Sequence, residues 1–301
     1  MKVRSITADN EGIILAGSLW EPPGIPAALL LMHPGSGPSD RDNDVLFPPI
    51  RATLLAAGIA VCSFDKRGVG ESGGSWLTAD IHTQATDLAV SLAAARAALP
   101  DVRAGLFGHS QGGWVVLEAL HQVAADFVVT NSGPGVSPRV QEIFSTGNQL
   151  DRLPLSADGR AAAVAVFADL MELVGRRVPY RTAAAWLAEP TRADALAALV
   201  DAGAFVPDEE SSWNFATMLI DHDPVPALQQ VRVPLLALFG GQDTVVPVAA
   251  SVQRYRAAVP EPLLNVRVLP GGDHRMQTGD DDAFVPGYLD ELVGFISSVV
   301  G

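Results

Sequence analysis

The sequence AGLFGHSQGGW, residues Ala104–Trp114, places a serine between an apolar run with β character and a run with the spacing of an amphipathic helix. A serine at such a strand–turn–helix junction has a strained backbone, so the residues two positions away on each side must be very small. Gly108 and Gly112 meet this requirement around Ser110. Although G-x-S-x-G can arise by chance in a chain with 28 glycines, the flanking runs are the context that the motif needs. We therefore predict that Ser110 is presented as a nucleophile.

Short apolar runs alternate with helical segments along most of the chain, which is typical of βαβ units and a mostly parallel sheet. The first two runs, Val3–Thr7 and Gly12–Leu19, flank a turn cluster and predict an antiparallel hairpin instead. Further strands are expected at 27–32, 59–64, 102–107, 126–131, 234–239 and 264–269, and helices at 45–57, 83–98, 114–123, 248–258 and 285–300. Since ligands bind beyond the carboxyl ends of parallel strands, the loops after these strands are where a site is expected.

From Val136 to Gln230 helical segments dominate, and no buried β-run of the earlier kind occurs. Helices are predicted here at 161–174, 181–187 and 191–202. Because a stretch of this length is unusual for a crossover connection, we predict a core of residues 1–135 and 231–301 with a helical cap inserted at 136–230 over the site. The cap's aromatic side chains Trp186, Trp213 and Phe215 are expected to shape an apolar substrate pocket.

A nucleophilic serine needs a general base, and the base needs a carboxylate that orients it. Asp243 and His274 each follow a predicted strand, as Ser110 does, so the three side chains are expected at the same edge of the sheet. In this arrangement His274 takes the hydroxyl proton and returns it to the leaving group, while Asp243 holds the tautomer of His274 and stabilises its charged form. Three other aspartates stay open as alternatives to Asp243: Asp273, Asp221 and Asp223.

The tetrahedral oxyanion of acyl transfer needs two N–H donors. One is expected from Gln111, at the start of the helix that follows the serine. The second is expected from the loop 33–37 after the third strand, where we favour the N–H of Ser36 over its neighbours. His33 is predicted to support this loop, and His109 is predicted to pack beside the site.

The chain of 301 residues carries a net charge of −14 and has a pI near 4.7, which argues against nucleic acid and anionic membranes as partners, since both require clustered Lys and Arg. No uncharged apolar run reaches the length of about 18 residues that a transmembrane helix needs. The N-terminus lacks the pattern of a signal peptide, and Cys62 is the single cysteine, which excludes an internal disulfide. We expect a cytoplasmic protein that acts on a small-molecule ester or acyl substrate; the oligomeric state is left open.

No H-E-x-x-H motif, paired cysteines or carboxylate cluster suggests a metal site, so no metal is expected. Asp40, Asp42 and Asp44 alternate along a loop, but the glycine and the terminal glutamate of a calcium loop are missing. The run Gly68–Gly73 matches a dinucleotide-binding motif only superficially, because no helix is expected directly after it.

Four motifs together resemble the α/β-hydrolase superfamily over essentially the whole chain: GHSQG at 108–112, DKRGVGES at 65–72, GGQD at 240–243 and GDH at 272–274. More narrowly, GSGPSDRD at 35–42 and SGPG at 132–135 are similar to bacterial capped serine esterases of the acyl-peptidase-like branch. The resemblance implies an α/β-hydrolase fold, with a mostly parallel central sheet flanked by helices and an inserted helical cap, and an esterase that needs no cofactor. Pro34 departs from the His-Gly pair that often leads into the oxyanion loop of this family.

We therefore predict a serine hydrolase that cleaves a carboxylic ester through an acyl-enzyme, with Ser110 as nucleophile, His274 as base and Asp243 as orienting acid. The motifs distinguish poorly among acyl substrates, so a thioesterase, a peptidase or a biosynthetic acyltransferase or cyclase on the same fold is the alternative. A non-catalytic ligand-binding protein is a further alternative, against which the intact Ser–Asp–His set argues.

Overall fold

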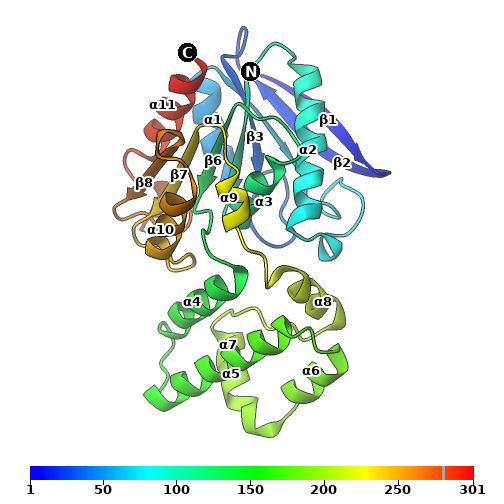
Figure 1. Cartoon of the computed structure of the whole chain (residues 1–301), viewed down its shortest axis with the longest axis vertical. Coiled ribbons are helices and arrows are strands. Elements are labelled where there is room, and N and C mark those ends of the chain that lie inside the picture. Colours follow the sequence, from blue (N-terminus) through cyan, green and yellow to red (C-terminus); the bar gives the residue numbers. More distant parts are fainter. Residues whose placement is uncertain (280–281) are drawn as a thin grey trace. The chain divides into compact units, whose positions relative to one another are not determined.

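The computed structural model describes residues 1–279 and 282–301 and divides into two compact units (Figure 1). The first, which we call the sheet unit, comprises Met1–Gly135, Pro224–Asp243 and Val248–Gly301. The second, the helical unit, comprises Val136–Asp223 and Thr244–Pro247. No helix in the described ranges is long and apolar enough to cross a membrane.

Within the described residues, an eight-stranded sheet forms the centre of the sheet unit, with the strand order β1-β2-β4-β3-β5-β6-β7-β8. The strands are β1 (Lys2–Asn10), β2 (Ile13–Glu21), β3 (Ala28–His33), β4 (Ile59–Phe64), β5 (Ala104–His109), β6 (Phe127–Asn131), β7 (Leu235–Gly240) and β8 (Leu264–Leu269). β2 pairs antiparallel with β1 and with β4, whereas all other neighbours in this sheet are parallel. The predicted hairpin and the predicted parallel sheet are confirmed. A short antiparallel pair follows β8, formed by β9 (Gln277–Thr278) and β10 (Ala283–Phe284).

Helices pack on both faces of the sheet, and this is why every residue of β3 to β7 is buried (Figure 1). They are α1 (Phe47–Ala56), α2 (Ile81–Ala98), α3 (Gln111–Ala119), α9 (Val225–Gln229), α10 (Val248–Ala258) and α11 (Tyr288–Val300), with 3₁₀ turns at Trp76–Thr78 and Glu261–Leu263. On one face, α1 and α11 share a core with strand residues such as Leu30, Val61 and Leu236. On the other face, α2 and α3 lie together.

Two of these helices begin later than the sequence predicts, each for a local backbone reason. α1 begins at Phe47 rather than Val45, and its first turn contains prolines, which fit there because the first N–H groups of a helix have no partner in any case. α11 begins at Tyr288 rather than Val285, because Gly287 takes a left-handed φ of 87° that interrupts the helical backbone.

The helical unit contains α4 (Pro138–Leu150), α5 (Ala157–Gly175), α6 (Tyr180–Leu187), α7 (Ala193–Asp201) and α8 (Glu210–Leu219), with a 3₁₀ turn at Pro190–Arg192. It has its own hydrophobic core, which includes Phe167, Leu199 and Trp213. Sequence analysis predicted α5, α6 and α7 but missed α4 and α8.

The boundary predicted at residue 230 differs from the division in the structure. α9 belongs to the sheet unit because it packs against α3 and α10, so the helical unit's long segment already ends at Asp223. In exchange, the helical unit includes Thr244–Pro247, since Thr244 accepts hydrogen bonds from two side chains at the end of α4, Asn148 at 2.9 Å and Arg152 at 2.7 Å.

Candidate active site

Ser110 occupies the sharp turn that its sequence predicts, between β5 and α3. Its backbone has φ 53° and ψ −123°, a conformation that is strained for a residue with a side chain. A Cβ added to Gly108 would lie 2.1 Å from the carbonyl oxygen of Gly112, and one added to Gly112 would lie 2.7 Å from the carbonyl oxygen of His33. Both glycines are therefore required for α3 to start this close to β5 and β3.

Asp243 and His274 meet at the carboxyl edge of the sheet. Asp243 lies in the loop after β7, and its Oδ2 is 2.9 Å from Nδ1 of His274, which lies in the loop after β8. The side chain of Asp243 is fully buried, whereas that of His274 is 19% exposed. The two loops are held together closely, because a Cβ on Gly240 would lie 2.0 Å from the carbonyl oxygen of Asp273. The pair therefore has the geometry in which a buried carboxylate orients an accessible imidazole.

Two of the three alternative aspartates, Asp273 and Asp221, have partners other than His274. Asp273 Oδ1 accepts hydrogen bonds from the backbone N–H groups of Arg275 and Gln277, each at 2.8 Å, and so closes the turn that carries His274. Asp221 and Asp223 belong to the helical unit, where Asp221 contacts Arg139 at 3.2 Å. Of the four aspartates considered, the structure pairs Asp243 with His274.

The imidazole of His274 lies beside His109, the residue that precedes Ser110 in the serine turn. The ring centroids of His109 and His274 are 5.0 Å apart, and His109 directly precedes Ser110. Burial, together with the nearby His274 and Arg275, holds the pKa of His109 well below its usual range, so this ring stays neutral. Its Nδ1 lies 3.0 Å from the side-chain amide of Asn131, which fixes the ring against the end of β6.

The loop after β3 approaches the serine from the other side. A Cβ on Gly35 would lie 3.4 Å from Cβ of Ser110, so the loop backbone passes close to the serine side chain. The Gly35 N–H donates to Oδ1 of Asn43 at 3.4 Å and so already has an acceptor. We therefore still favour the next amide, the N–H of Ser36, as the donor that this loop would provide to the oxyanion. Gln111 is the first residue of α3, where backbone N–H groups have no partner within the helix.

Lys66 contacts both parts of this loop–helix junction, and sequence analysis missed it. Its ammonium donates to the carbonyl oxygens of Gly35 at 2.6 Å and Gly37 at 3.2 Å, and reaches Oε1 of Gln111 at 3.4 Å. The residue is only 7% exposed, and burial lowers the pKa of Lys66 to about 7. The signal in the sequence was a lysine two residues after a buried strand, inside the DKRGVGES motif.

The rest of the DKRGVGES motif forms an ion-paired loop after β4. Asp65 accepts two hydrogen bonds from the guanidinium of Arg41, at 2.9 and 2.6 Å, and one from the N–H of Glu71 at 3.0 Å. Burial alone would raise the pKa of Asp65, but these hydrogen bonds outweigh it and lower the pKa. Gly70 has φ 55° and passes so close to Asp65 that a Cβ would lie 2.4 Å from Oδ2. Gly70 is therefore required by the geometry of this loop, and the match of 68–73 to a dinucleotide-binding motif is only superficial.

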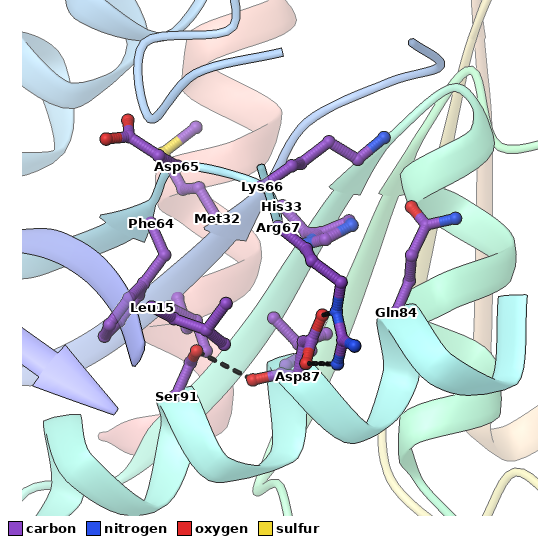
Figure 2. Close-up of a pocket in the computed structure, with 12 residues that line it drawn as sticks. Leu15, Met32, His33, Phe64, Asp65, Lys66, Arg67, Gln84, Asp87 and Ser91 are labelled. Atoms are coloured by element: carbon purple, nitrogen blue, oxygen red, sulfur yellow. Dashed lines mark hydrogen bonds and ion pairs between the residues drawn. The ribbon is translucent and has the colours of Figure 1, made fainter. Parts of the chain in front are cut away.

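A small cavity of about 20 Å³ lies behind this loop (Figure 2). Figure 2 shows Arg67 paired with Asp87, while the ammonium of Lys66 points away from that pair. His33 also lines the cavity, and burial lowers the pKa of His33 to about 3, which keeps it neutral. The volume is far below the roughly 300 Å³ at which ligand pockets begin, so this cavity is not a substrate pocket.

The three aromatic residues expected to bind substrate all lie in the helical unit. Trp213 is 1% exposed in that unit's core and donates its indole N–H to the carbonyl oxygen of Val178 at 2.9 Å. Trp186 packs at the edge of the same core, with the guanidinium of Arg192 4.3 Å above its ring. Phe215 is 7% exposed. A substrate-binding role for the three stays a prediction, and Trp213 has a clear structural role.

The parallel sheet covered on both faces and the strained serine after β5 define an α/β-hydrolase. The chain belongs to the Hydrolase_4 family, described as serine aminopeptidase S33, which matches residues 45–281. The expected superfamily and fold class are thereby confirmed, and the family is one of serine hydrolases.

Solved structures with the same fold include two esterases and a peptidase. The Pyrococcus furiosus esterase Pf2001 has a TM-score of 0.66 at 17% identity, over 100% of this chain and 92% of that one. A thermostable carboxyl esterase from Bacillus coagulans has a TM-score of 0.65 at 16% identity, over the full length of both chains. A proline iminopeptidase from Mycobacterium smegmatis has a TM-score of 0.64 at 21% identity, over 99% of each chain. No curated protein matches the chain.

Proposed function

We propose that this protein hydrolyses a carboxylic ester through an acyl-enzyme formed on Ser110. The observation that carries the proposal is the hydrogen bond of 2.9 Å between the fully buried carboxylate of Asp243 and Nδ1 of His274, next to the strained serine turn. A buried carboxylate on Nδ1 holds the proton there and leaves Nε2 of the ring free to accept one. This is the protonation state that a general base for a serine hydroxyl requires.

In the proposed reaction, Nε2 of His274 accepts the proton of the Ser110 hydroxyl as its oxygen attacks the substrate carbonyl. The charged imidazolium is stabilised by Asp243 and then gives its proton to the leaving alcohol, so that an acyl-serine forms and the C–O bond of the ester breaks. Water then repeats the sequence: His274 takes its proton, the acid is released and the Ser110 hydroxyl is restored. No net proton is gained or lost by the enzyme.

The oxyanion of both tetrahedral intermediates is expected between the N–H of Gln111 and the N–H of Ser36. The first follows from the position of Gln111 at the start of α3, where the helix dipole adds partial positive charge. The second is supported by the close approach of Gly35 to the Ser110 side chain and by the hydrogen bond of the Gly35 N–H to Asn43. Two N–H donors from different elements would then bind one oxygen.

An aminopeptidase is the second candidate, and the description of the family favours it. Such an enzyme must bind the substrate's terminal ammonium with a carboxylate near the scissile bond. In the described part of the sheet unit, three carboxylates on the loops around the serine have a basic partner: Asp243 with His274, Asp65 with Arg41, and Asp44 with Arg275. These pairings support a neutral acyl substrate over one whose ammonium would bind to any of these three carboxylates, and so an ester over a peptide.

The test is a panel of activated substrates with one common assay. Wild-type protein should hydrolyse p-nitrophenyl esters of short and medium acids faster than an acyl thioester or an aminoacyl p-nitroanilide of similar size. A fluorophosphonate probe should label Ser110, as located by mass spectrometry, and Ser110→Ala should lose labelling and at least about 10³-fold of turnover.

Ser132 offers a matched control for the labelling experiment. It also follows a strand, β6, with a positive φ of 51°, and is fully buried. Ser132→Ala should keep fluorophosphonate labelling. Faster cleavage of the anilide than of every ester would replace the esterase proposal with the aminopeptidase, and labelling that survives in Ser110→Ala would refute the nucleophile.

A further inference from the structure

Lys66 is a buried cation whose partners in the described structure are all uncharged. It lies two residues after the end of β4, and its ammonium contacts the carbonyl oxygens of Gly35 and Gly37 and the side-chain oxygen of Gln111, at 2.6, 3.2 and 3.4 Å. The two carboxylates that line the cavity beside it have other partners. Asp65 is paired with Arg41, and Asp87 is paired with Arg67 (Figure 2). A buried charge that is balanced only by dipoles is unfavourable in the resting protein.

The acceptors of Lys66 belong to both sides of the proposed oxyanion site. Gly35 and Gly37 flank Ser36, the loop donor, and Gln111 carries the helix donor. When their carbonyl and amide oxygens bind the ammonium, the loop and the first turn of α3 are held against each other. Among the described residues, no carboxylate is paired with Lys66 in the resting site. A negative charge develops beside Lys66 only during attack, on the substrate oxygen. Interactions that strengthen only at that moment lower the barrier rather than tighten substrate binding.

We propose that Lys66 is the positioning residue of the oxyanion site: it holds loop 35–37 against Gln111 and places a positive charge behind the two N–H donors. This inference rests on the proposed function, because it requires an oxyanion at Ser110. Lys66 acts through the loop and through its field and does not touch the reacting atoms.

The experiment compares Lys66→Met, which keeps the length of the side chain but removes charge and donors, with Lys66→Gln, which keeps donors without the charge. Arg67→Met is the matched control, since it removes the adjacent cation, which is also shielded from solvent but is paired with Asp87 rather than with the oxyanion loop. Three quantities are measured for each: kcat and KM on a p-nitrophenyl ester, and Ki for an alkyl trifluoromethyl ketone, which forms an anionic tetrahedral adduct with serine. A methyl ketone of the same chain length serves as the neutral ligand that does not form this adduct.

For Lys66→Met we expect kcat to fall about 10–100-fold with KM changed less than about threefold, and the affinity for the trifluoromethyl ketone to fall by the same factor as kcat/KM. Affinity for the methyl ketone should stay the same. Lys66→Gln should lie between Lys66→Met and wild type, and Arg67→Met should keep kcat within about twofold even though its melting temperature drops. A loss that affects both ketones equally would indicate a collapsed site and would overturn the proposal, as would an unchanged kcat.

Three further results decide cases in which a variant does not fold or the proposed function itself is in question. If Lys66→Met does not fold, Lys66→Gln decides, since it retains hydrogen-bond donors to the loop carbonyls: equal kcat in Lys66→Gln and wild type rejects a role for the charge. If wild-type protein is labelled at Ser110 and hydrolyses esters while the Lys66 variants match it, only this inference fails. If wild-type protein is neither labelled nor active, the proposed function fails and the inference fails with it.

Discussion

Asp243→Asn tests the proposed base most directly, because it changes one buried atom and hardly alters side-chain volume. In the structure, Oδ2 of Asp243 lies 2.9 Å from Nδ1 of His274, and the carboxylate is fully buried. An asparagine can turn its NH₂ group toward Nδ1, which would move the ring proton to Nε2. His274 would then present a donor to Ser110, and it could no longer accept the hydroxyl proton.

The size of the effect follows from the same distance. With about 4 Å between the two charge centres and an effective dielectric constant of about 20, the attraction between the carboxylate and an imidazolium is about 4 kcal/mol. Loss of this attraction in the transition state corresponds to about 10³-fold in kcat. The wrong tautomer adds to the loss, and the corresponding change in a serine protease lowers kcat about 10⁴-fold. We therefore expect Asp243→Asn to lower kcat about 10³–10⁴-fold.

The assay is steady-state hydrolysis of a p-nitrophenyl ester, with Asp273→Asn as the matched control. Asp273 neighbours His274 in sequence, but its Oδ1 accepts from the N–H groups of Arg275 and Gln277, and an asparagine oxygen can do the same. Asp273→Asn should keep kcat within about threefold of wild type. The reasoning is refuted if Asp243→Asn retains more than about a tenth of wild-type kcat, or if Asp273→Asn loses more activity than Asp243→Asn does.

Three other predictions follow from the packing and the titration of single residues. Gly108→Ala would place a Cβ 2.1 Å from the carbonyl oxygen of Gly112. It should lower the free energy of unfolding by about 1–3 kcal/mol and lower kcat at least about 10²-fold. A urea unfolding curve and a kcat that both match wild type would contradict the turn geometry. Trp213→Ala should lower the stability of the helical unit by about 3–5 kcal/mol, and Trp213→Phe by less, because the phenyl ring still fills much of the space although the indole bond to Val178 is lost; a denaturation midpoint that does not shift in Trp213→Ala would show that the residue is not in the core. Burial lowers the pKa of Lys66 to about 7, below its unfolded value of about 10.4, so between these pH values the unfolded chain binds more protons than the folded protein does. The contribution of Lys66 to the free energy of unfolding should therefore rise as the pH rises from about 7 to about 10.4. Over the same range kcat should fall with a midpoint near pH 7, and this alkaline fall should be absent in Lys66→Gln.

Features that depend on neighbours in sequence could be predicted from the chain itself. Gly108 is required by a contact with Gly112, only a few residues away, and the strand–turn–helix reading holds in the structure, whereas Gly112 is required by its distant contact with His33. The apolar runs predicted as strands are also confirmed, because a strand buried on both faces must be apolar throughout. α4 and α8 were missed although α8 begins with a capping box between Glu209 and Ser212; both helices are rich in polar residues, and each contributes side chains to the core around Trp213.

The sequence by itself thus determined the fold class, the serine turn and the residue types of a base and an acid. Only the tertiary structure decided which aspartate faces His274, since Asp243 is 31 residues away while Asp273 is adjacent in sequence. It also decided that Lys66 reaches Gln111, 45 residues further on, and that α9 belongs to the sheet unit. The physical reason is that periodicity and turn chemistry depend on near neighbours, whereas a buried hydrogen bond depends on where two distant loops meet at the edge of the sheet.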